Sequence, residues 1–424
     1  MMKRKTLFVK IFESISQMID SVIFQAQCKQ RLEDFVRKRK MGFKEYIWYM
    51  LANVKRSLAS SLHSFLSRMH SGAECCTKQA FSQGRLRINP EAFRLLLNVV
   101  RDQFYENADY RLWHGYRVSA TDGSKCNLPL SKELMEKYGI QKGTGGQVQA
   151  LISCLYDVLN MMILDADMFP HNANERNLAS RHISRLKAIN QKVKDLLLFD
   201  RGYPSAKLLQ ELQAKGLFYV MRCSSSFCKM INLTGDDNIT EHKFSKLSEP
   251  MKIRIVRVCL DDKTTEILVT NIFDSDISAE DFKKLYHLRW EIETTYGTMK
   301  HKLMLEDFSG KTDIAVQQDF LAMTVIVNLL GVIQYDNRDE IEALRAEKPE
   351  VMYKYKQNLN YTIGLYRDNL IELVVCKSHA KRLLLYYQLR KAMQKNLVPV
   401  RPGRSSPRVA KHPGARFAAN LRLP

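Results

Sequence analysis

The chain has 424 residues, of which 45% are hydrophobic, and its formal net charge is +21 at pH 7. This length suits about two to four domains with a large core, and the positive charge favours a polyanionic partner, either nucleic acid or an anionic membrane. The most apolar run, residues 320–333, is too short to span a bilayer and contains Thr324 and Asn328. We therefore expect nucleic acid as the partner, no membrane partner, and a buried core helix at this run.

The N-terminus and the cysteines bear on the compartment. Lys10, Glu13 and Asp20 interrupt the apolar stretch behind the first residues, so we find no signal-peptide core. The nine cysteines form no Cys-x-x-Cys pair, which argues against a zinc site and against a secreted disulfide scaffold. We expect a cytoplasmic protein with reduced thiols.

The N-terminal part of the chain predicts helices. Apolar residues recur at helical spacing through residues 11–22 and again through residues 43–66. Asn89, Pro90 and Glu91 indicate a third helix, because they supply an N-cap, a proline at the first helical position and an acid in the first turn.

A basic segment without acids, residues 77–87, precedes this third helix. A helical module with such a connecting segment is suited to docking on DNA. A generic helical subdomain with a solvated surface is the alternative.

From Arg117 the pattern changes to short strands, and two of them are predicted to end at an aspartate, Asp122 or Asp200. The expected elements are strands at 117–121, 148–156, 161–168 and 196–199, a glycine-rich turn at 143–146, a tight connection at 157–160, and a helix at 175–194. This order predicts an α/β, ribonuclease-H-like fold, in which the first and fourth strands are neighbours.

A second strand-rich block covers residues 217–275. Its expected strands are 217–222, 253–260 and 265–271. Since the block follows the strand that ends at Asp200, we interpret it as a β-rich insertion in the catalytic domain.

Four polar side chains share one stripe of a helix predicted after this block: Tyr286, Arg289, Glu293 and Lys300. At about 100° per residue they fall within an arc of roughly 60° and span roughly 21 Å. A carboxylate that can hold a metal ion thus lies among groups that bind phosphate, which suits an enzyme that cuts or joins nucleic acid. A solvated, charged helix face is the alternative for any one of them.

The C-terminal tail has no acidic residue after Glu372, while lysines and arginines continue to Arg422. Residues 399–408 are too rich in proline and glycine for a regular element. We predict an extended arm that becomes ordered on DNA, with a solubilising tail as the alternative.

Three acids are candidate metal ligands: Asp122, Asp200 and Glu293. Cleavage and transfer of a phosphodiester need an activated oxygen nucleophile and a stabilised leaving oxygen, which carboxylate-bound divalent ions provide. Neighbouring first and fourth strands would bring the two aspartates together, and the helix after the insertion would present Glu293 opposite them. An Asp-Gly pair alone usually marks a turn, but a strand as apolar as residues 196–199 rarely needs an acid for packing.

The spacing Tyr-(2)-Arg-(3)-Glu-(6)-Lys resembles the signature of the IS4 group of bacterial insertion-sequence transposases, which are DDE transposases. The resemblance covers most of the chain, roughly residues 43–416. It includes Thr121-Asp122-Gly123, residues 171–176, Asp200-Arg-Gly-Tyr203, residues 268–271, the signature helix, and Val-Pro-Val-Arg-Pro-Gly-Arg near the C-terminus.

This resemblance implies roles for the six residues. Asp122, Asp200 and Glu293 would bind two Mg²⁺ ions, with Mn²⁺ as a substitute. The signature residues Tyr286, Arg289 and Lys300 would engage transposon-end DNA near the scissile phosphate.

The resemblance also implies cut-and-paste DNA transposition, with a hairpin at the excised end as one route. The partners would be the terminal inverted repeats, the target DNA and a second copy of the chain in a paired-end complex at the bacterial nucleoid. Two alternatives are a catalytically inactive or domesticated DNA-binding relative, and a hydrolytic nuclease without strand transfer. The expected parts are an N-terminal helical DNA-binding domain (1–110), a catalytic domain in two pieces (111–216 and 281–340), the β insertion (217–280), and a C-terminal helical region with the basic tail (341–424).

Overall fold

The computed structural model describes residues 6–37, 39–70, 76–141, 146–186, 193–232, 235–245, 247, 249–261, 264–346 and 353–400. The chain divides into two compact units. The first comprises Met1–Ala108, Cys126–Ala150 and Thr298–Pro424, and the second comprises Asp109–Lys125 and Leu151–Gly297. Most of the predicted glycine-rich turn and the basic tail after Val400 lie outside the described residues.

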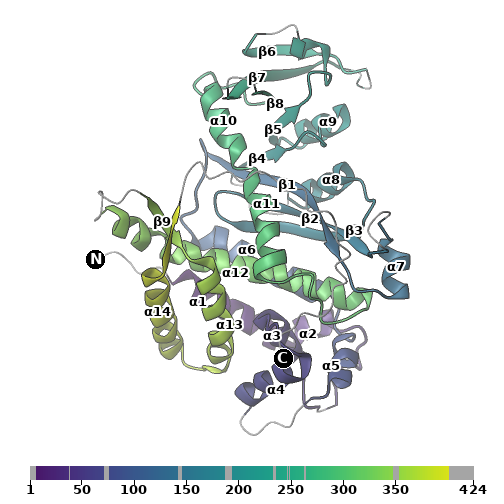
Figure 1. Cartoon of the computed structure of the whole chain (residues 1–424), viewed down its shortest axis with the longest axis vertical. Helices are drawn as coiled ribbons and strands as arrows, with labels where there is room; N and C mark the ends of the chain where they lie inside the picture. Colours follow the sequence, from purple (N-terminus) through teal and green to yellow (C-terminus); the bar gives the residue numbers. More distant parts are fainter. Residues whose placement is uncertain are drawn as a thin grey trace. The chain divides into compact units, whose positions relative to one another are not determined.

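The first unit is mainly helical (Figure 1). Its α-helices are α1 (Leu7–Asp20), α2 (Val22–Cys28), α3 (Phe43–Ala52), α4 (Leu58–Met69), α5 (Lys78–Arg85), α6 (Glu91–Asn107), α7 (Lys132–Tyr138), α12 (Asp313–Ala346), α13 (Leu359–Val375) and α14 (His379–Lys395). The unit also contains a π-helix, Thr298–Lys302, and a two-stranded antiparallel sheet of β9 (Lys354–Gln357) and β10 (Leu397–Val400). Because Pro399 and Val400 belong to β10, the extended arm does not start at Pro399 as predicted.

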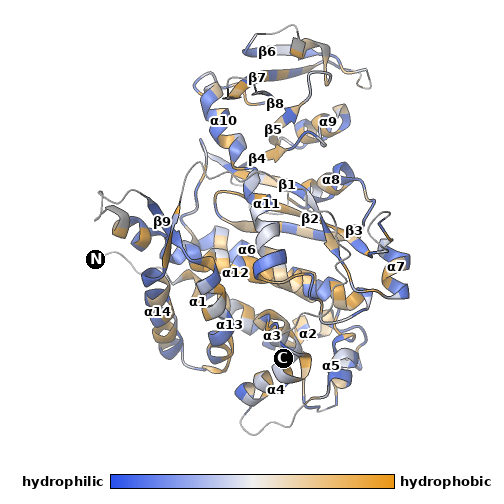
Figure 2. Ribbon diagram, in the orientation of Figure 1, coloured by the Kyte–Doolittle hydropathy of each residue, from blue (hydrophilic) through white to orange (hydrophobic). Residues whose placement is uncertain are grey.

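The long helix α12 forms the core of this unit and packs against α1, α3 and α6. By length and composition alone, Asp313–Leu344 could cross a membrane, but 89% of its apolar window is buried inside the structure. Such burial is typical of a core helix, and the apolar stretch is visible in orange in Figure 2. The buried helix predicted at residues 320–333 is confirmed.

Two predictions for the N-terminal helices need correction. The helical pattern of residues 43–66 is broken, because Asn53 adopts a left-handed conformation that ends α3. The basic segment 77–87 contains a helix, α5, and its Arg85 is only 1% exposed. The Arg85 guanidinium bonds Gln318 Oε1 at 2.8 Å and Asp319 Oδ1 at 2.6 Å, so this cation holds the core and is not available to DNA.

The third N-terminal helix, α6, is present but begins one residue later than predicted, at Glu91 with Pro90 as its N-cap. The N–H of Glu91, the first residue of α6, donates to Oδ1 of Asn89 at 3.0 Å. This bond satisfies one of the helix's free N–H groups.

The second unit is built on an eight-stranded sheet with the order β3-β2-β1-β4-β5-β8-β7-β6 (Figure 1). The strands are β1 (Tyr116–Asn127), β2 (Gln149–Asp157), β3 (Met162–Pro170), β4 (Lys194–Phe199), β5 (Phe218–Cys223), β6 (Asp237–His242), β7 (Met251–Asp261) and β8 (Thr264–Thr270). The end of β1 and the start of β2 fall in the first unit. The helices are α8 (Glu175–Leu186), α9 (Ala206–Ala214), α10 (Ala279–His287) and α11 (Trp290–Gly297).

The first and fourth strands are parallel neighbours, as predicted. A buried ion pair fixes their register, since Nε and Nη2 of Arg117 bond the carboxylate of Asp195, its partner across the sheet, at 2.7 and 3.0 Å. A slip by one residue would leave a buried charge unpaired, at a cost of about 3–5 kcal/mol. This pair therefore sets which residues face each other at the ends of the two strands.

Two strand predictions differ from the structure, and one strand was not predicted. β1 continues through Asp122 to Asn127 and does not end at Asp122. The segment 217–222, interpreted as part of an insertion, forms β5, which pairs in parallel with β4 and continues the main sheet. The polar strand β6 had no apolar alternation in its sequence, but it pairs with β7 through its backbone.

Candidate active site

Two aspartates lie at matching positions on adjacent strands. The parallel pairing of β1 with β4 runs to Ala120 opposite Leu198. Two residues further, the same register reaches Asp122 on β1 and Asp200 directly after β4. Each of the two aspartates that the sequence selected therefore follows the last pair of these parallel strands by two residues, at the same end of the sheet.

The signature residues do not lie on one continuous helix, which corrects the prediction. The helix α10 ends at His287, and the N–H of Arg289 bonds the carbonyl of Tyr286 at 3.0 Å, three residues back. This tighter turn joins α10 to α11, and the π-helix Thr298–Lys302 follows α11. Tyr286 and Arg289 still share a side, because a turn of three residues is one full turn of such a helix. Short 3₁₀ and π segments inside helices often mark functional positions.

Arg289 connects two of the three acids. Its side chain is 4% exposed; Nη2 bonds Glu293 Oε1 at 2.8 Å, and Nη1 lies 3.7 Å from Asp122 Oδ2. The guanidinium carbon also lies 5.2 Å from the ring centre of Trp290. Arg289 is therefore the counter-ion of Asp122 and Glu293 in this conformation.

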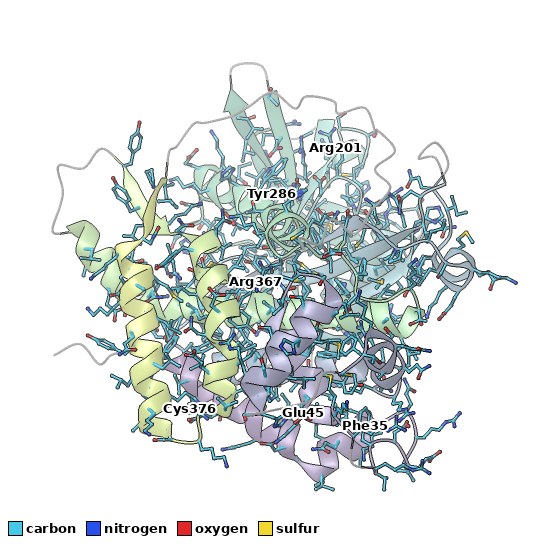
Figure 3. The ribbon with its side chains drawn as sticks, turned by 60° about the horizontal axis from the view of Figure 1, so that its bottom comes forward. Phe35, Glu45, Arg201, Tyr286, Arg367 and Cys376 are labelled. Atoms are coloured by element: carbon cyan, nitrogen blue, oxygen red, sulfur yellow. The ribbon has the colours of Figure 1, made fainter. Side chains whose placement is uncertain are left out.

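Tyr286 contacts the third acid. This residue lies in the last turn of α10 and is labelled in Figure 3. Its hydroxyl donates to the carbonyl of Phe199 at 3.2 Å and to Asp200 Oδ1 at 3.3 Å. Burial and the negative charge of Asp200 raise the pKa of Tyr286, so the phenol keeps its proton and acts as a donor.

Lys300 belongs to the first unit, where it lies in the π-helix and is half-buried. Burial and the negative charge of Glu306 raise the pKa of the Cys126 thiol. The positive charge of Lys300 opposes this rise. The structure thus groups Tyr286, Arg289 and the three acids in one unit, and Lys300 in the other.

The surroundings of Asp122 change its pKa. Burial raises its pKa from 3.8 to about 6, against the N–H of Gly123 and the charge of Arg289, which lower it. The neighbouring acids Glu175 and Glu293 raise it further. Acids crowded in this way are stabilised by a bound cation.

This shift predicts that Asp122 destabilises the folded protein at neutral pH when no divalent cation is present. Because the folded-state pKa of about 6 lies above the ordinary 3.8, the folded chain binds more protons between these values, and stability falls as pH rises through this window. We expect Asp122→Asn to raise the free energy of unfolding at pH 7.5 on the order of 2 kcal/mol, with no gain near pH 3.5. Thermal unfolding in EDTA at both pH values measures this. An equal effect of the substitution at both would contradict it.

Tyr296 was missed in the sequence, although it lies three residues after Glu293 on α11. Its buried hydroxyl donates to the carbonyl of Asp122 at 2.7 Å and accepts the N–H of Cys154 at 2.9 Å. The contact ties the helix that carries Glu293 to the strand that carries Asp122. The spacing of three residues, which places side chains on one helix face, was the available signal.

A buried polar chain lies behind Asp122. Ser153 Oγ is 2.9 Å from His182 Nε2, and His182 Nδ1 is 2.7 Å from Asp165 Oδ2. These residues have the order of a hydrolytic triad, but all three are at most 5% exposed, so no substrate reaches the serine. Since Ser153 Oγ also lies 3.4 Å from the carbonyl of Asp122, the chain supports that strand.

The acids fit a divalent cation by donor chemistry. Asp122, Asp200 and Glu293 offer carboxylate oxygens only, the type of ligand that Mg²⁺ and Mn²⁺ prefer. In the described conformation Glu293 is bonded to Arg289, and no three His, Cys, Asp or Glu side chains among the described residues are grouped to hold a metal ion. Glu293 would therefore have to leave Arg289 before it could share a cation with the aspartates.

The chain is similar to several known proteins. A family model described as a transposase DDE domain matches residues 113–329, which is half of the chain. The transposase InsG for insertion sequence element IS4 of Escherichia coli (strain K12) is 20% identical over 316 residues, covering 70% of each protein. A cryo-EM structure of the piggyBac transposase synaptic complex with hairpin DNA is 12% identical, with a TM-score of 0.48, over 94% of this chain and 86% of that chain.

Proposed function

The chain belongs to the DDE transposases of the IS4 family, and on this premise we propose that it is an active cut-and-paste enzyme. It cleaves the ends of its own element by metal-dependent phosphodiester hydrolysis. It then joins the freed 3′-hydroxyl ends to target DNA.

One observation carries this proposal. Asp122 and Asp200 occupy matching positions on β1 and after β4, and Arg289 links Asp122 to Glu293. Three acids from distant parts of the sequence thus belong to one group. In this group the Arg289 guanidinium takes the place that a metal cation would take. A protein that only bound DNA would gain nothing from crowding carboxylates in this way, since they repel phosphate.

The fold assignment that accompanies the proposal is ribonuclease-H-like. It is supported by the strand order β3-β2-β1-β4-β5 and by the parallel pairing of β1, β4 and β5. The antiparallel strands β8, β7 and β6 extend this sheet and carry the chain to α10.

The two divalent ions would be Mg²⁺, for which Mn²⁺ can substitute. They would be held by Asp122, Asp200 and Glu293. When bound, such ions lower the pKa of an attacking water or hydroxyl and stabilise the leaving oxygen. Tyr286 keeps Asp200 oriented through its hydroxyl. When DNA binds, Arg289 bonds a phosphate oxygen instead of Glu293. The Glu293 carboxylate is then free to bind the metal ion.

The proposed partners are the terminal inverted repeats, target DNA and a second copy of the chain in the paired-end complex, in the bacterial cytoplasm. The formal net charge of +21 supports a polyanionic partner. Tyr286, Arg289 and Lys300 are the signature residues that we assign to the transposon end.

A single assay separates this proposal from its alternatives. The purified protein is incubated with Mg²⁺, a plasmid carrying the element with its ends, and a target plasmid, and the products are sequenced. Excision at the boundary and joints between element ends and target identify the transposase. Cleavage without joints identifies a hydrolytic nuclease, and a gel shift without cleavage identifies an inactive DNA-binding relative.

A further inference from the structure

A cavity of about 320 Å³ lies among the N-terminal helices of the first unit. Its walls come from the segment that follows α2 and from α3 and α5. The described residues that line it include three cations, Arg39, Lys40 and Arg87, and no acid. A cavity of this size and charge suits a small ligand that carries a negative group.

One aromatic residue of this cavity has a strained backbone. Phe35, labelled in Figure 3, has a φ of 60°, in the left-handed region that a bulky residue rarely adopts. Its half-buried ring meets the rings of Phe43 and Tyr46 edge-on, with 5.7 Å between ring centres in each pair. Such strain costs on the order of 1–3 kcal/mol and is concentrated at ligand sites. The fold therefore holds this ring at the cavity despite an energetic cost.

Tyr46 forms a fixed aromatic wall of the same cavity. Its ring stacks on Phe81 of α5, with 5.4 Å between ring centres, and its hydroxyl donates to the carbonyl of Ala80 at 3.3 Å. Glycine at position 84 permits this approach, because a Cβ atom added to Gly84 would lie 1.9 Å from the hydroxyl oxygen. The cavity thus has a rigid apolar side made of rings.

The turn before Phe35 is tied to the end of the basic segment 77–87. The N–H of Gln30 donates to the carbonyl of Arg87 at 2.8 Å, and Nε of Arg87 lies 3.7 Å from Asp34 Oδ1. These contacts place Arg87 and Phe35 on the same cavity. The basic segment therefore reaches this cavity through Arg87.

The segment that follows Phe35 is strongly basic. Residues 37–40 are Arg-Lys-Arg-Lys, and Arg39 and Lys40 are exposed where they line the cavity. Phosphate oxygens are suitable partners for such side chains, and an arginine can bind two of them at once. Phe35 and this basic run precede residue 43, where the family resemblance begins, so the resemblance gives them no role.

A solvated basic surface does not explain the strained ring or the aromatic wall. Cations alone suffice to bind the sugar-phosphate backbone of any DNA. Aromatic rings beside cations are the combination that binds a nucleobase together with its phosphate, and stacking contributes about 1–3 kcal/mol per base. A base inside a duplex is stacked on its neighbours and cannot enter a pocket. The ligand that fits is therefore a nucleotide without a pairing partner.

We propose that this cavity binds one unpaired nucleotide of DNA. The base lies against the ring of Phe35, and the three cations bind the phosphate. The inference rests on the proposed function, because it takes DNA as the partner. It adds a nucleotide site, built by the first unit alone, to the acid group of the second unit.

The test compares two strands that carry the same phosphates. A labelled oligothymidine and an abasic strand of equal length are titrated with the full-length protein in EDTA, and binding is followed by fluorescence anisotropy. We expect Phe35→Ala to raise the Kd for oligothymidine about tenfold, which corresponds to about 1.4 kcal/mol, and to leave the Kd for the abasic strand unchanged. Phe35→Tyr, which keeps a ring, should retain the wild-type Kd. Tyr361→Ala, which removes an exposed ring of the same unit, is the matched control and should change neither Kd.

Two further variants complete the test. Glycine adopts a left-handed backbone without strain, so Phe35→Gly removes the ring in a folded protein even if Phe35→Ala unfolds. It should lose the same affinity for oligothymidine. Arg39→Ala should instead weaken both strands by a similar factor and flatten the salt dependence of binding, because it removes a phosphate contact.

A duplex of the element end is the third probe, and it distinguishes failure of this inference from failure of the proposed function. If the wild type binds the duplex while the Phe35 variants keep the wild-type Kd for oligothymidine, the cavity is not a nucleotide site and the proposed function stands. Equal weakening of the oligothymidine and the abasic strand by Phe35→Ala would also overturn the inference, since the ring would then not contact a base. If the wild type binds none of the three probes, both proposals fail.

Discussion

We expect Asp122→Asn, Asp200→Asn and Glu293→Gln each to lower the rate of end cleavage about 10³-fold or more, a loss of about 4 kcal/mol of transition-state stabilisation. The amide keeps the shape of the carboxylate but carries no charge, so it holds a divalent cation poorly. DNA affinity stays close to that of the wild type, because none of the three substitutions removes a positive charge. Cleavage rates on labelled end DNA in Mg²⁺, and binding to the same DNA in EDTA, measure the two effects separately.

Asp276→Asn is the matched control, since Asp276 is an exposed aspartate of the same unit. It should cut at the wild-type rate. Asp122→Asn should be more stable than the wild type at pH 7.5 in EDTA. If that gain is measured, the loss of its activity does not result from unfolding. An acid whose amide variant still cuts at near the wild-type rate would have to be removed from the proposed centre.

The strand that precedes Asp200 could be predicted because it is buried and apolar. Residues 196–199 form a continuous apolar run, as expected of a central parallel strand covered on both faces. The register could not be predicted, because it depends on the ion pair of Arg117 with Asp195. Nothing in the sequence shows that these two charges meet inside the sheet.

The path of the signature segment could not be predicted from its periodicity either. The apolar and polar spacing fits one α-helix, but the bonds at Arg289 and the π-helix from Thr298 depend on how the segment packs. The same limit applies to Arg85, whose partners Gln318 and Asp319 lie far along the chain. A basic segment can be recognised in a sequence, but the partners of its charges cannot.

We expect Arg289→Lys to weaken assembly of the paired-end complex at least about tenfold, and Arg289→Ala to weaken it further. In the structure the guanidinium reaches Glu293 with one nitrogen and approaches Asp122 with another. A lysine ammonium is a single point and cannot serve two acids, nor can it make the forked contact to phosphate that we propose. Complex formation on end DNA, followed by native gel in EDTA, measures the loss.

Lys300→Ala should also weaken assembly, while Lys207→Ala, which removes an exposed lysine from α9, serves as the charge-matched control. If both lysine variants assembled poorly, the effect of Lys300 would come only from its contribution to the net charge. Normal assembly of Arg289→Ala and Lys300→Ala would show that these cations serve the fold and not the transposon end.

The Mg²⁺ affinity of the same variants separates the roles of Arg289 and Glu293. Removing the guanidinium leaves two acids without their counter-ion, so their attraction for a divalent cation grows. Arg289→Ala should therefore bind Mg²⁺ at least as tightly as the wild type while it assembles poorly. Glu293→Gln should show the opposite pattern, with weak Mg²⁺ binding and normal assembly. If Arg289→Ala instead lost Mg²⁺ affinity, the guanidinium would be holding the acids in place for the metal, and the proposed exchange of Glu293 for a phosphate would be wrong.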